Sequence, residues 1–288
     1  MGNKSRFAIA ENSIKSFFLK GSQKIFSREQ LRAVFEDKKS AWKLPIGLYA
    51  DKFIEQLIKK EILKVEEILF DEQKKKELFV VGDDIPIFQI ATSIYGKSYL
   101  SHYSAMYLNG LTVQVPKTIY ITNEQSKKNG LNRTLTQESI DGAFSKPQRK
   151  SLFRTNYKGY VLVIHNGMNT NRLGLTSKDG VYFTNIERTL IDIAVRPNYA
   201  GGVFDVLEAY KKAIPNISIN KLIAILNTLD FIYPYSQAIG FYLEKAGYDG
   251  GKLKELKNKR TEFDFYLTYE MKETNYSKEW KLFYPKGI

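Results

Sequence analysis

The sequence predicts an α+β protein of two domains, and three observations support this prediction. At 288 residues the chain is longer than most single compact domains. The pattern of its first part predicts three helices and a hairpin. This first part ends at the turn-forming run GDDIP, residues 82–86. Its second part mixes apolar residues at helical spacing with apolar residues that alternate. We therefore predict a small domain over residues 1–88 and a larger mixed α/β domain over residues 89–288.

Composition narrows the class of protein. The hydrophobic fraction of 43% and the aromatic fraction of 14% are typical of a globular chain rather than a disordered one. No stretch approaches the roughly 20 apolar residues of a membrane helix, and the first residues lack the apolar core of a secretory signal. We therefore expect a cytoplasmic protein.

Residue counts also restrict the chemistry. The absence of cysteine excludes disulfides, thiolate catalysis and cysteine zinc sites, and two histidines leave little for histidine metal binding. No Gly-x-Ser-x-Gly string or phosphate-binding glycine loop is present. We expect no cofactor, no metal and no enzymatic activity.

The charge of the chain is large and unevenly distributed. The formal net charge is +13, and residues 1–60 contain 13 Lys or Arg against 6 Asp or Glu, whereas residues 61–90 are net acidic. A basic N-terminal part indicates a polyanionic partner.

Two helices open this basic part. The first spans about residues 8–20, with Ile14, Phe17 and Phe18 on its apolar face. The second begins at a capping box, Ser27 with Gln30, and residues 31, 34 and 35 form its buried face.

A third helix and a hairpin follow. The helix comes after Pro45 and buries Ile54, Leu57 and Ile58. Alternation over residues 63–70, a polar turn over 71–76 and an apolar run over 78–81 predict the hairpin. This order is that of a winged helix-turn-helix domain, whose third helix enters the major groove of DNA.

Several side chains of this domain are candidates for DNA contacts. Gln56 is the one obvious candidate for reading a base edge, because lysine and arginine at phosphates add affinity without sequence information. A solvated helix face is the alternative interpretation of each position. The predicted DNA-binding residues are Arg28, Arg32, Lys43, Lys52, Gln56, Lys59, Lys74, Lys75 and Lys76, the last three at the wing tip.

The larger domain is expected to start with a helix over residues 100–111 that closes at Asn109-Gly110, followed by a strand over 118–122. Residues 126–158 carry 8 Lys or Arg against 2 acidic residues and predict loops with edge strands. Clearer strands are expected over 160–165 and 181–183.

Helices dominate the rest of the prediction. A capping box of Thr184 and Glu187 opens a helix that must end before Pro197. Further helices fit residues 203–213, 218–228 and 235–246, and alternation from Phe263 to Met271 predicts a half-buried strand.

Two strings in the larger domain carry a family resemblance. They are YLSHYSAMYLNGLT at residues 99–112 and FTNIERTLID at residues 183–192. Together, behind a predicted winged helix, they resemble the AbiEi family of antitoxins from abortive-infection toxin-antitoxin systems. The resemblance covers roughly residues 90–215.

The resemblance implies two activities. The winged helix would bind inverted repeats in the operon promoter and repress it. From the basic N-terminal part and the order of its helices, we expect two or more copies to bind these repeats cooperatively. The larger domain would counteract a nucleotidyltransferase-like toxin without necessarily forming a stable complex with it, as in type IV systems.

The motif residues carried over from this resemblance also have structural interpretations. Glu187 can cap its helix, Arg188 and Asp192 can pair at i, i+4, and His102 can be a buried, hydrogen-bonded histidine. The predicted antitoxin-domain motif comprises His102, Ser104, Glu187, Arg188 and Asp192.

Two other functions compete with this hypothesis. A stand-alone winged-helix regulator would use its second domain to sense a ligand or to dimerise. A nuclease is the remote alternative, because Asp264, Glu270 and Lys272 loosely imitate a metal-binding motif. On one straight strand, however, Asp264 and Glu270 would lie roughly 20 Å apart, too far to share a metal ion.

Two further basic runs, at residues 146–158 and 252–260, fit either additional DNA contacts or an acidic toxin. The sequence leaves this choice open.

Overall fold

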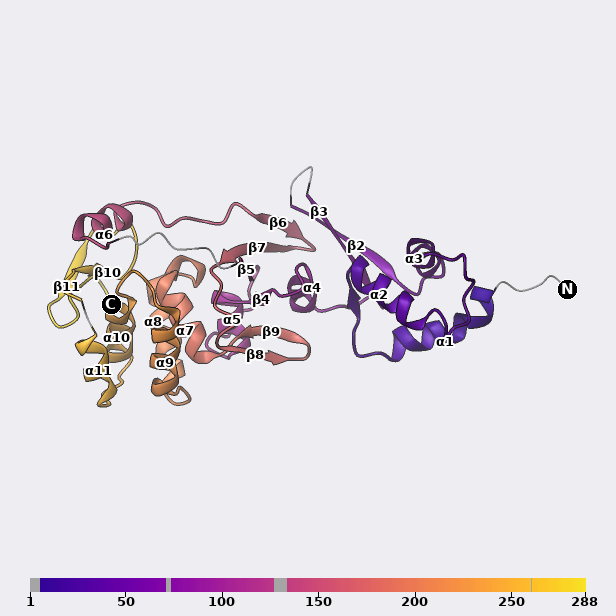
Figure 1. Cartoon of the computed structure of the whole chain (residues 1–288). Coiled ribbons are helices and arrows are strands. Elements are labelled where there is room, and N and C mark those ends of the chain that lie inside the picture. Colours follow the sequence, from indigo (N-terminus) through magenta and orange to yellow (C-terminus); the bar gives the residue numbers. More distant parts are fainter. Residues whose placement is uncertain (1–5, 71–73, 127–133, 260) are drawn as a thin grey trace. The chain divides into compact units, whose positions relative to one another are not determined.

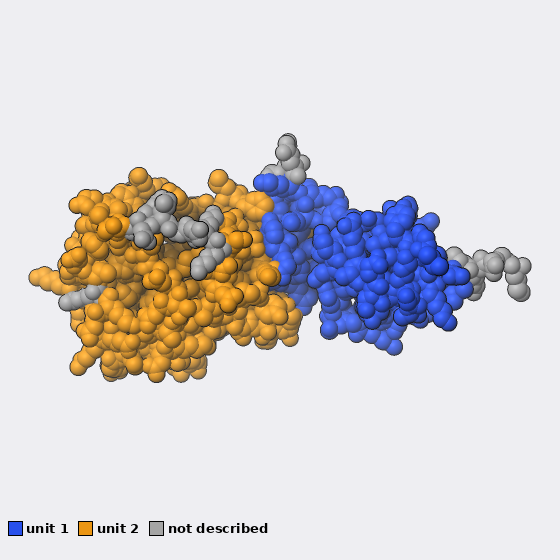
Figure 2. Space-filling view, viewed as in Figure 1, with its two compact units in different colours: residues 1–96 blue, residues 97–288 orange. Residues whose placement is uncertain are grey.

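The computed structural model describes residues 6–70, 74–126, 134–259 and 261–288, and it has an α+β fold. The chain divides into two compact units, residues 1–96 and 97–288 (Figure 2). The division falls after Gly96 rather than after residue 88, because helix α4 (Ile87–Ser93) packs against strand β1 of the first unit. No helix in the described part of the chain has the length and apolar character needed to cross a lipid bilayer.

The first unit has the predicted order of three helices and a hairpin (Figure 1). The elements are α1 (Arg6–Lys20), β1 (Ile25–Phe26), α2 (Arg28–Lys38), α3 (Ala50–Lys59), β2 (Lys64–Leu69) and β3 (Lys75–Val80). Strand β3 lies between β1 and β2 and is antiparallel to both.

Local sequence explains where α2 begins. The backbone N–H of Gln30 donates to Ser27 Oγ at 3.2 Å, and the backbone N–H of Ser27 donates to Gln30 Oε1 at 2.8 Å. These reciprocal bonds confirm the predicted capping box, which satisfies two N–H groups that the helix itself leaves unpaired. Phe26 and Leu31 are both buried beside it, as a hydrophobic staple requires.

The apolar core of the first unit differs from the prediction at its margin. Phe17 is 36% exposed and packs edge-on against Trp42, so it is not part of the fully buried stripe. Ile58 is half-buried, whereas Phe53, which the prediction overlooked, is fully buried between aromatic rings. The buried face of α3 therefore consists of Phe53, Ile54 and Leu57 instead of Ile54, Leu57 and Ile58.

The second unit contains a six-stranded mixed sheet with the order β6-β7-β5-β4-β9-β8. The strands are β4 (Tyr99–Leu100), β5 (Thr118–Glu124), β6 (Arg154–Tyr157), β7 (Tyr160–Gly167), β8 (Leu175–Lys178) and β9 (Val181–Thr184). Strands β5 and β7 are parallel, as are β4 and β9, while the other neighbours are antiparallel.

Helices gather beside this sheet in the second unit (Figure 1). They are α5 (His102–Leu108), α6 (Gln137–Phe144), α7 (Ile186–Val195), the 3-10 turn η1 (Pro197–Tyr199), α8 (Val203–Ala213), α9 (Ile219–Leu229), α10 (Tyr235–Lys245) and α11 (Lys252–Asn258). Helix α7 packs against α5, α8, α9 and α10 and is buried along nearly its whole length. A small sheet, β10 (Phe265–Tyr266), β12 (Leu282–Pro285) and β11 (Thr274–Ser277), covers the far side of this helical core.

Three predictions for this unit need correction. The helix expected over 100–111 starts only at His102, because Tyr99 and Leu100 form a central strand of the sheet. The loop-rich region 126–158 contains α6, which begins at its own capping residue Thr136; residues 127–133 lie outside the described part. The cap of α7 is Asn185 rather than Thr184, since Asn185 Oδ1 accepts the N–H of Arg188 at 2.9 Å.

The predicted strand from Phe263 to Met271 is also much shorter. Only Phe265 and Tyr266 pair with β12, and Glu270 adopts a φ of +48°, which turns the chain. The straight strand that we expected to hold Asp264 and Glu270 far apart therefore does not form. The Asp264 carboxylate instead accepts a hydrogen bond from the Tyr276 hydroxyl at 2.6 Å.

Candidate functional site

An ion-pair network joins the start of α2 to the start of α3 and to the hairpin. Arg28 Nη1 lies 3.2 Å from Asp51 Oδ1, and Arg28 Nη2 lies 3.0 Å from Glu77 Oε2. Arg32 Nη2 lies 3.0 Å from Asp51 Oδ2. The Arg28 guanidinium also lies over the ring of Phe79, 5.3 Å from its centroid. The two arginines predicted to contact phosphates therefore already have acidic partners.

The predicted lysines of α3 and of the loop before it are in different environments. Lys52 Nζ lies 2.8 Å from Glu55 Oε2 on the same helix. Lys59, in the last turn of α3, and Lys43, in the turn after α2, are exposed and have no ion pair within the described residues. These two lysines are therefore the predicted cations most open to an external anion.

Gln56 does not point fully outward. It is half-buried, and its Oε1 is buried without a hydrogen-bond partner among the described residues. Gln56 lies three residues after the buried Phe53, which places both on neighbouring faces of α3. Its expected role in reading a base edge would require the side chain to turn out of this position.

The hairpin places its lysines differently from the prediction. Lys75 and Lys76 lie in β3 rather than in the turn, and Lys75 forms an ion pair with Glu67 across the hairpin. Lys74 is exposed beside the turn. The tip itself, residues 71–73, lies outside the described part of the chain.

The two further basic runs differ in their pairing. In the C-terminal run, Lys252 and Lys259 pair with Glu255, and Lys257 pairs with Glu244. Arg260 lies outside the described residues.

The run before β7 is less neutralised. Lys146, Arg149, Lys150 and Arg154 are exposed and form no ion pair within the described residues. The more open basic surface of the second unit is therefore the run at residues 146–158.

The two family-like strings lie side by side in the second unit. Leu100 of β4 pairs with Phe183 of β9 in the parallel ladder. Asn109 Nδ2, in the first string, donates to the backbone oxygen of Thr184 at 2.9 Å and to Thr189 Oγ1 at 3.1 Å. Residues about 80 positions apart in sequence are thus held together by one amide.

His102 and Ser104 are buried at the start of α5. Ser101 Oγ lies 2.8 Å from His102 Nδ1, and Ser104 Oγ accepts the backbone N–H of Tyr120 at 2.9 Å. Burial lowers the pKa of His102 well below its usual value. The expected buried, hydrogen-bonded histidine is confirmed, and Ser104 ties α5 to the central strand β5.

The motif residues of α7 are also buried and paired. Arg188 Nε lies 2.8 Å from Asp192 Oδ1, which confirms the expected i, i+4 pair. Burial raises the pKa of Asp192, with Arg188 acting in the opposite direction. Glu187 does not cap its own helix: it accepts the backbone N–H of Ser218 and pairs with Lys221, which fixes the start of α9.

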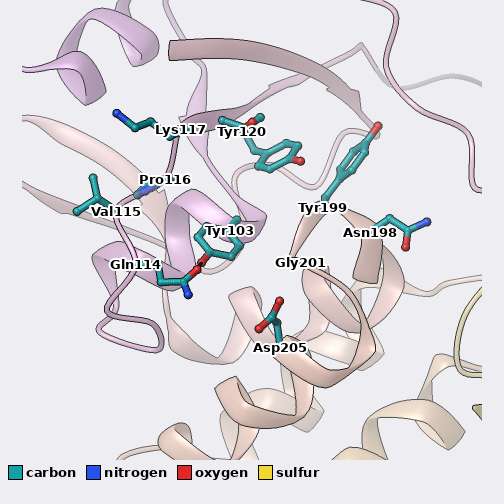
Figure 3. A pocket seen from close by; sticks show the side chains of 11 residues that line it. Tyr103, Gln114, Val115, Pro116, Lys117, Tyr120, Asn198, Tyr199, Gly201 and Asp205 are labelled. Atoms are coloured by element: carbon teal, nitrogen blue, oxygen red, sulfur yellow. Dashed lines mark hydrogen bonds between the residues drawn. The ribbon is translucent and has the colours of Figure 1, made fainter. Parts of the chain in front are cut away.

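A cleft of about 390 Å³ opens in the second unit where the start of β5 meets η1 and α8 (Figure 3). Tyr120 and Tyr199 are stacked in one wall, with ring centroids 4.9 Å apart. The hydroxyl of Tyr120 and the carboxylate of Asp205 have no partner within the described residues. The lining also includes Tyr103, Gln114 and Asn198.

Backbone geometry and charge shape this cleft. Gly201 has a φ of +90°, and a Cβ at this position would lie 2.1 Å from Asp205 Oδ2, so only glycine lets the carboxylate lie there. The Lys117 side chain points away from the tyrosines in Figure 3, with its ammonium over the ring of Tyr160. Asp205 is therefore the charged group that the lining turns toward the cleft.

The sequence did not predict the acidic partners of Arg28 or the cleft, for different reasons. Asp51 and Glu77 were visible as acidic residues, but their contact with Arg28 joins positions 23 and 49 residues apart. The cleft residues come from segments around 103–120 and 198–205, which no local pattern connects. In the described part of the chain, no three His, Asp or Glu side chains gather to hold a metal ion.

No protein-family model matches this chain, and no curated protein matches it significantly. Among solved structures, the chain is similar to the Rv2827c protein from Mycobacterium tuberculosis, with a TM-score of 0.58 and 16% identity. The match covers 98% of this chain and 93% of the other, so the likeness extends over both units. At this level of identity it shows a shared fold.

Proposed function

We propose that this chain is an antitoxin and a DNA-binding autorepressor of a toxin-antitoxin operon. In this proposal the first unit is a winged helix-turn-helix domain, with α3 in the major groove and the β2–β3 hairpin as the wing. The observation that carries it is the order α1, α2, α3 and antiparallel hairpin, together with an α3 that buries Phe53, Ile54 and Leu57 and leaves its opposite side exposed.

Charge supports the same proposal. The chain has a formal net charge of +13, and its first 60 residues contain 13 Lys or Arg against 6 Asp or Glu. Because Arg28 and Arg32 are paired with acidic residues, we assign the main phosphate contacts to Lys43 and Lys59. The partner would be promoter DNA with inverted repeats, bound by more than one copy.

The antitoxin part of the proposal rests on the resemblance of residues 99–112 and 183–192 to AbiEi antitoxins. The neighbouring positions of the two strings support their treatment as one motif. A nucleotidyltransferase-like gene beside this one would support the antitoxin role, and growth rescue upon co-expression would test it.

The first experiment is a DNA-binding titration. The purified chain is titrated against DNA from directly upstream of its gene and against a shuffled duplex, at several salt concentrations. We expect tighter binding to the upstream DNA and an affinity that falls steeply with salt. Equal binding to both duplexes, or no binding, would contradict the proposal.

A charge reversal locates the DNA-binding surface. Lys59→Glu should weaken binding and lower the salt slope by about one to two phosphate contacts, because it removes a cation and adds an anion. Lys212→Glu on the exposed side of α8 makes the same change of charge in the other unit. Equal losses in both variants would show only a general effect of net charge.

The cleft of the second unit favours a second candidate function, a stand-alone regulator that senses a small ligand. Its unpaired Asp205 carboxylate and Tyr120 hydroxyl suit a compact molecule that donates hydrogen bonds, such as an amine or a guanidine. Aromatic side chains supply the wall against which such a molecule would pack.

Thermal unfolding with arginine, agmatine and spermidine tests this candidate. A ligand at about 100 times its Kd should raise the melting temperature of the second unit by roughly 5–10 °C. Asp205→Asn should abolish the shift while leaving the unliganded melting temperature nearly unchanged, since Asp205 is exposed. A shift that persists in this variant would contradict binding through the carboxylate.

A further inference from the structure

Asp51 is the centre of the network on the proposed DNA-binding face. One of its carboxylate oxygens lies 3.2 Å from Arg28 and 3.1 Å from Arg32, and the other lies 3.0 Å from Arg32. The two arginines lie one turn apart at the start of α2, and Asp51 lies in the first turn of α3. One acidic side chain therefore connects the helix expected to cross the DNA backbone with the helix expected to enter the groove.

The network is electrically neutral in the free protein. Arg28, Arg32 and Lys75, which also pairs with Glu77, contribute three positive charges, and Asp51, Glu77 and Glu67 contribute three negative charges. Hydrogen bonds from Arg32 and then Arg28 hold the pKa of Asp51 below its usual range, so Asp51 is ionised at neutral pH. The sequence predicts a basic surface where α2, α3 and the hairpin meet, but the net charge of this network is zero.

We propose that Asp51 is a specificity-determining residue, which makes the arginines of α2 recognise DNA by geometry rather than by charge. This proposal rests on the proposed DNA-binding function. The carboxylate holds the guanidinium groups in fixed orientations and leaves their remaining N–H groups free to donate to base edges or to one phosphate position. It also repels phosphates that approach in any other register.

The expected effect is a penalty on non-specific binding. Affinity for arbitrary DNA comes almost entirely from neutralised phosphates, and a neutral cluster supplies little of it. At the correct site, the fixed donors bind without losing much side-chain entropy. Asp51 thus lowers the affinity for wrong sequences more than it lowers the affinity for the right one.

The chain offers a matched control on the same helix. Glu55 is exposed, lies one turn from Asp51 and pairs with Lys52 at 2.8 Å, but this pair connects no second element. Asp51→Asn and Glu55→Gln remove the same charge from the same helix. Only the first removes the carboxylate that Arg28 and Arg32 share; it releases Arg32, whereas Arg28 keeps its pair with Glu77.

The test measures binding of wild type, Asp51→Asn, Glu55→Gln and Asp51→Glu to the upstream duplex and to a shuffled duplex of the same composition. For Asp51→Asn we expect about three- to tenfold tighter binding to the shuffled duplex at low salt. Its salt slope should steepen by about 0.9, the value of one additional phosphate contact. The ratio of the two affinities should fall about tenfold, whereas Glu55→Gln should keep it within about twofold.

The outcomes are distinct. Asp51→Glu, which keeps the charge, should restore most of the ratio, and matching circular dichroism spectra would show that the variants are folded. If Asp51→Asn and Glu55→Gln change the ratio equally, the effect is one of charge alone and the inference is overturned. If the wild type fails to prefer the upstream duplex, the proposed function itself fails.

A second variant keeps the inference testable if Asp51→Asn does not fold. Arg32→Gln removes one of the two oriented arginines and leaves Asp51 in place. It should lower the ratio of affinities while weakening binding to both duplexes. An unchanged ratio would overturn the inference.

Discussion

His102 and His165 lie beside Tyr199 with their ring centroids 5.8 Å apart. Burial lowers the pKa of His165 to about 4, and the nearby Arg196 acts in the same direction. The pKa of His102 is lowered for the same main reason. Both rings are therefore neutral in the folded protein at neutral pH.

This pair predicts the acid sensitivity of the second unit. The unfolded chain binds protons near the ordinary histidine pKa of about 6.5, while the folded chain resists them until a lower pH. The free energy of unfolding should therefore fall from about pH 6.5 downward, by up to about 1.4 kcal/mol per pH unit for each histidine, until its folded pKa is reached. Urea titrations of wild type and His165→Gln between pH 7 and pH 4 measure this, and the variant should show the smaller slope. Parallel profiles would show that His165 carries none of the effect.

Single residues also show which parts of the site could be predicted. The Arg188–Asp192 pair follows from their spacing on one helix, and it forms as predicted. The acidic partners of Arg28 could not be predicted, because they depend on how α2, α3 and the hairpin fold together. Local spacing is readable from sequence, whereas contacts between distant segments are not.

At the scale of elements, packing decides what sequence patterns leave open. Helices α8, α9 and α10 form within one residue of their predicted ends, since apolar spacing, caps and stop signals agree there. Helix α6 was missed because a contact across the chain supports it: Gln137 exchanges two hydrogen bonds with the backbone of Asp264, 127 residues away. The short strand β8 was missed although a local signal exists, because Asp179-Gly180 forms the two-residue turn that joins it to β9.

The packing of α10 yields a prediction about one glycine. A Cβ at Gly240 would lie 2.1 Å from the buried Trp280 ring, so Gly240→Ala should destabilise the second unit by about 1–3 kcal/mol or more. Gly142→Ala in α6 is the matched control, because a Cβ there meets no atom within 4 Å. The control should be neutral or stabilise by up to about 1 kcal/mol. Chemical denaturation compares the two, and equal effects would contradict the close contact.

At the scale of the molecule, each unit has its own hydrophobic core. One core lies among α1, α2, α3 and the hairpin, and the other lies among the helices of residues 97–288 and the small sheet of β10, β12 and β11. The strands of each sheet come from one unit alone. Each unit therefore has the contacts of an independent folding unit.

This division predicts that residues 97–288 fold without the first unit. The fragment should show cooperative thermal unfolding and the near-ultraviolet circular dichroism of its packed aromatic core, which includes Trp280, Tyr210 and Tyr242. It should also fail to bind the upstream duplex specifically, if the first unit carries that activity. A fragment that lacks a cooperative transition would show that the two cores depend on each other.

The edge strands of the six-stranded sheet affect whether copies of this protein aggregate. The two outermost strands are β6 and β8, with the sequences RTNY and LTSK, and both are short. Exposed strand edges are templates for aggregation, and short edges with charged side chains are poor templates. Arg154 and Lys178 place positive charge on these two short edges, which disfavours the joining of copies into an intermolecular sheet.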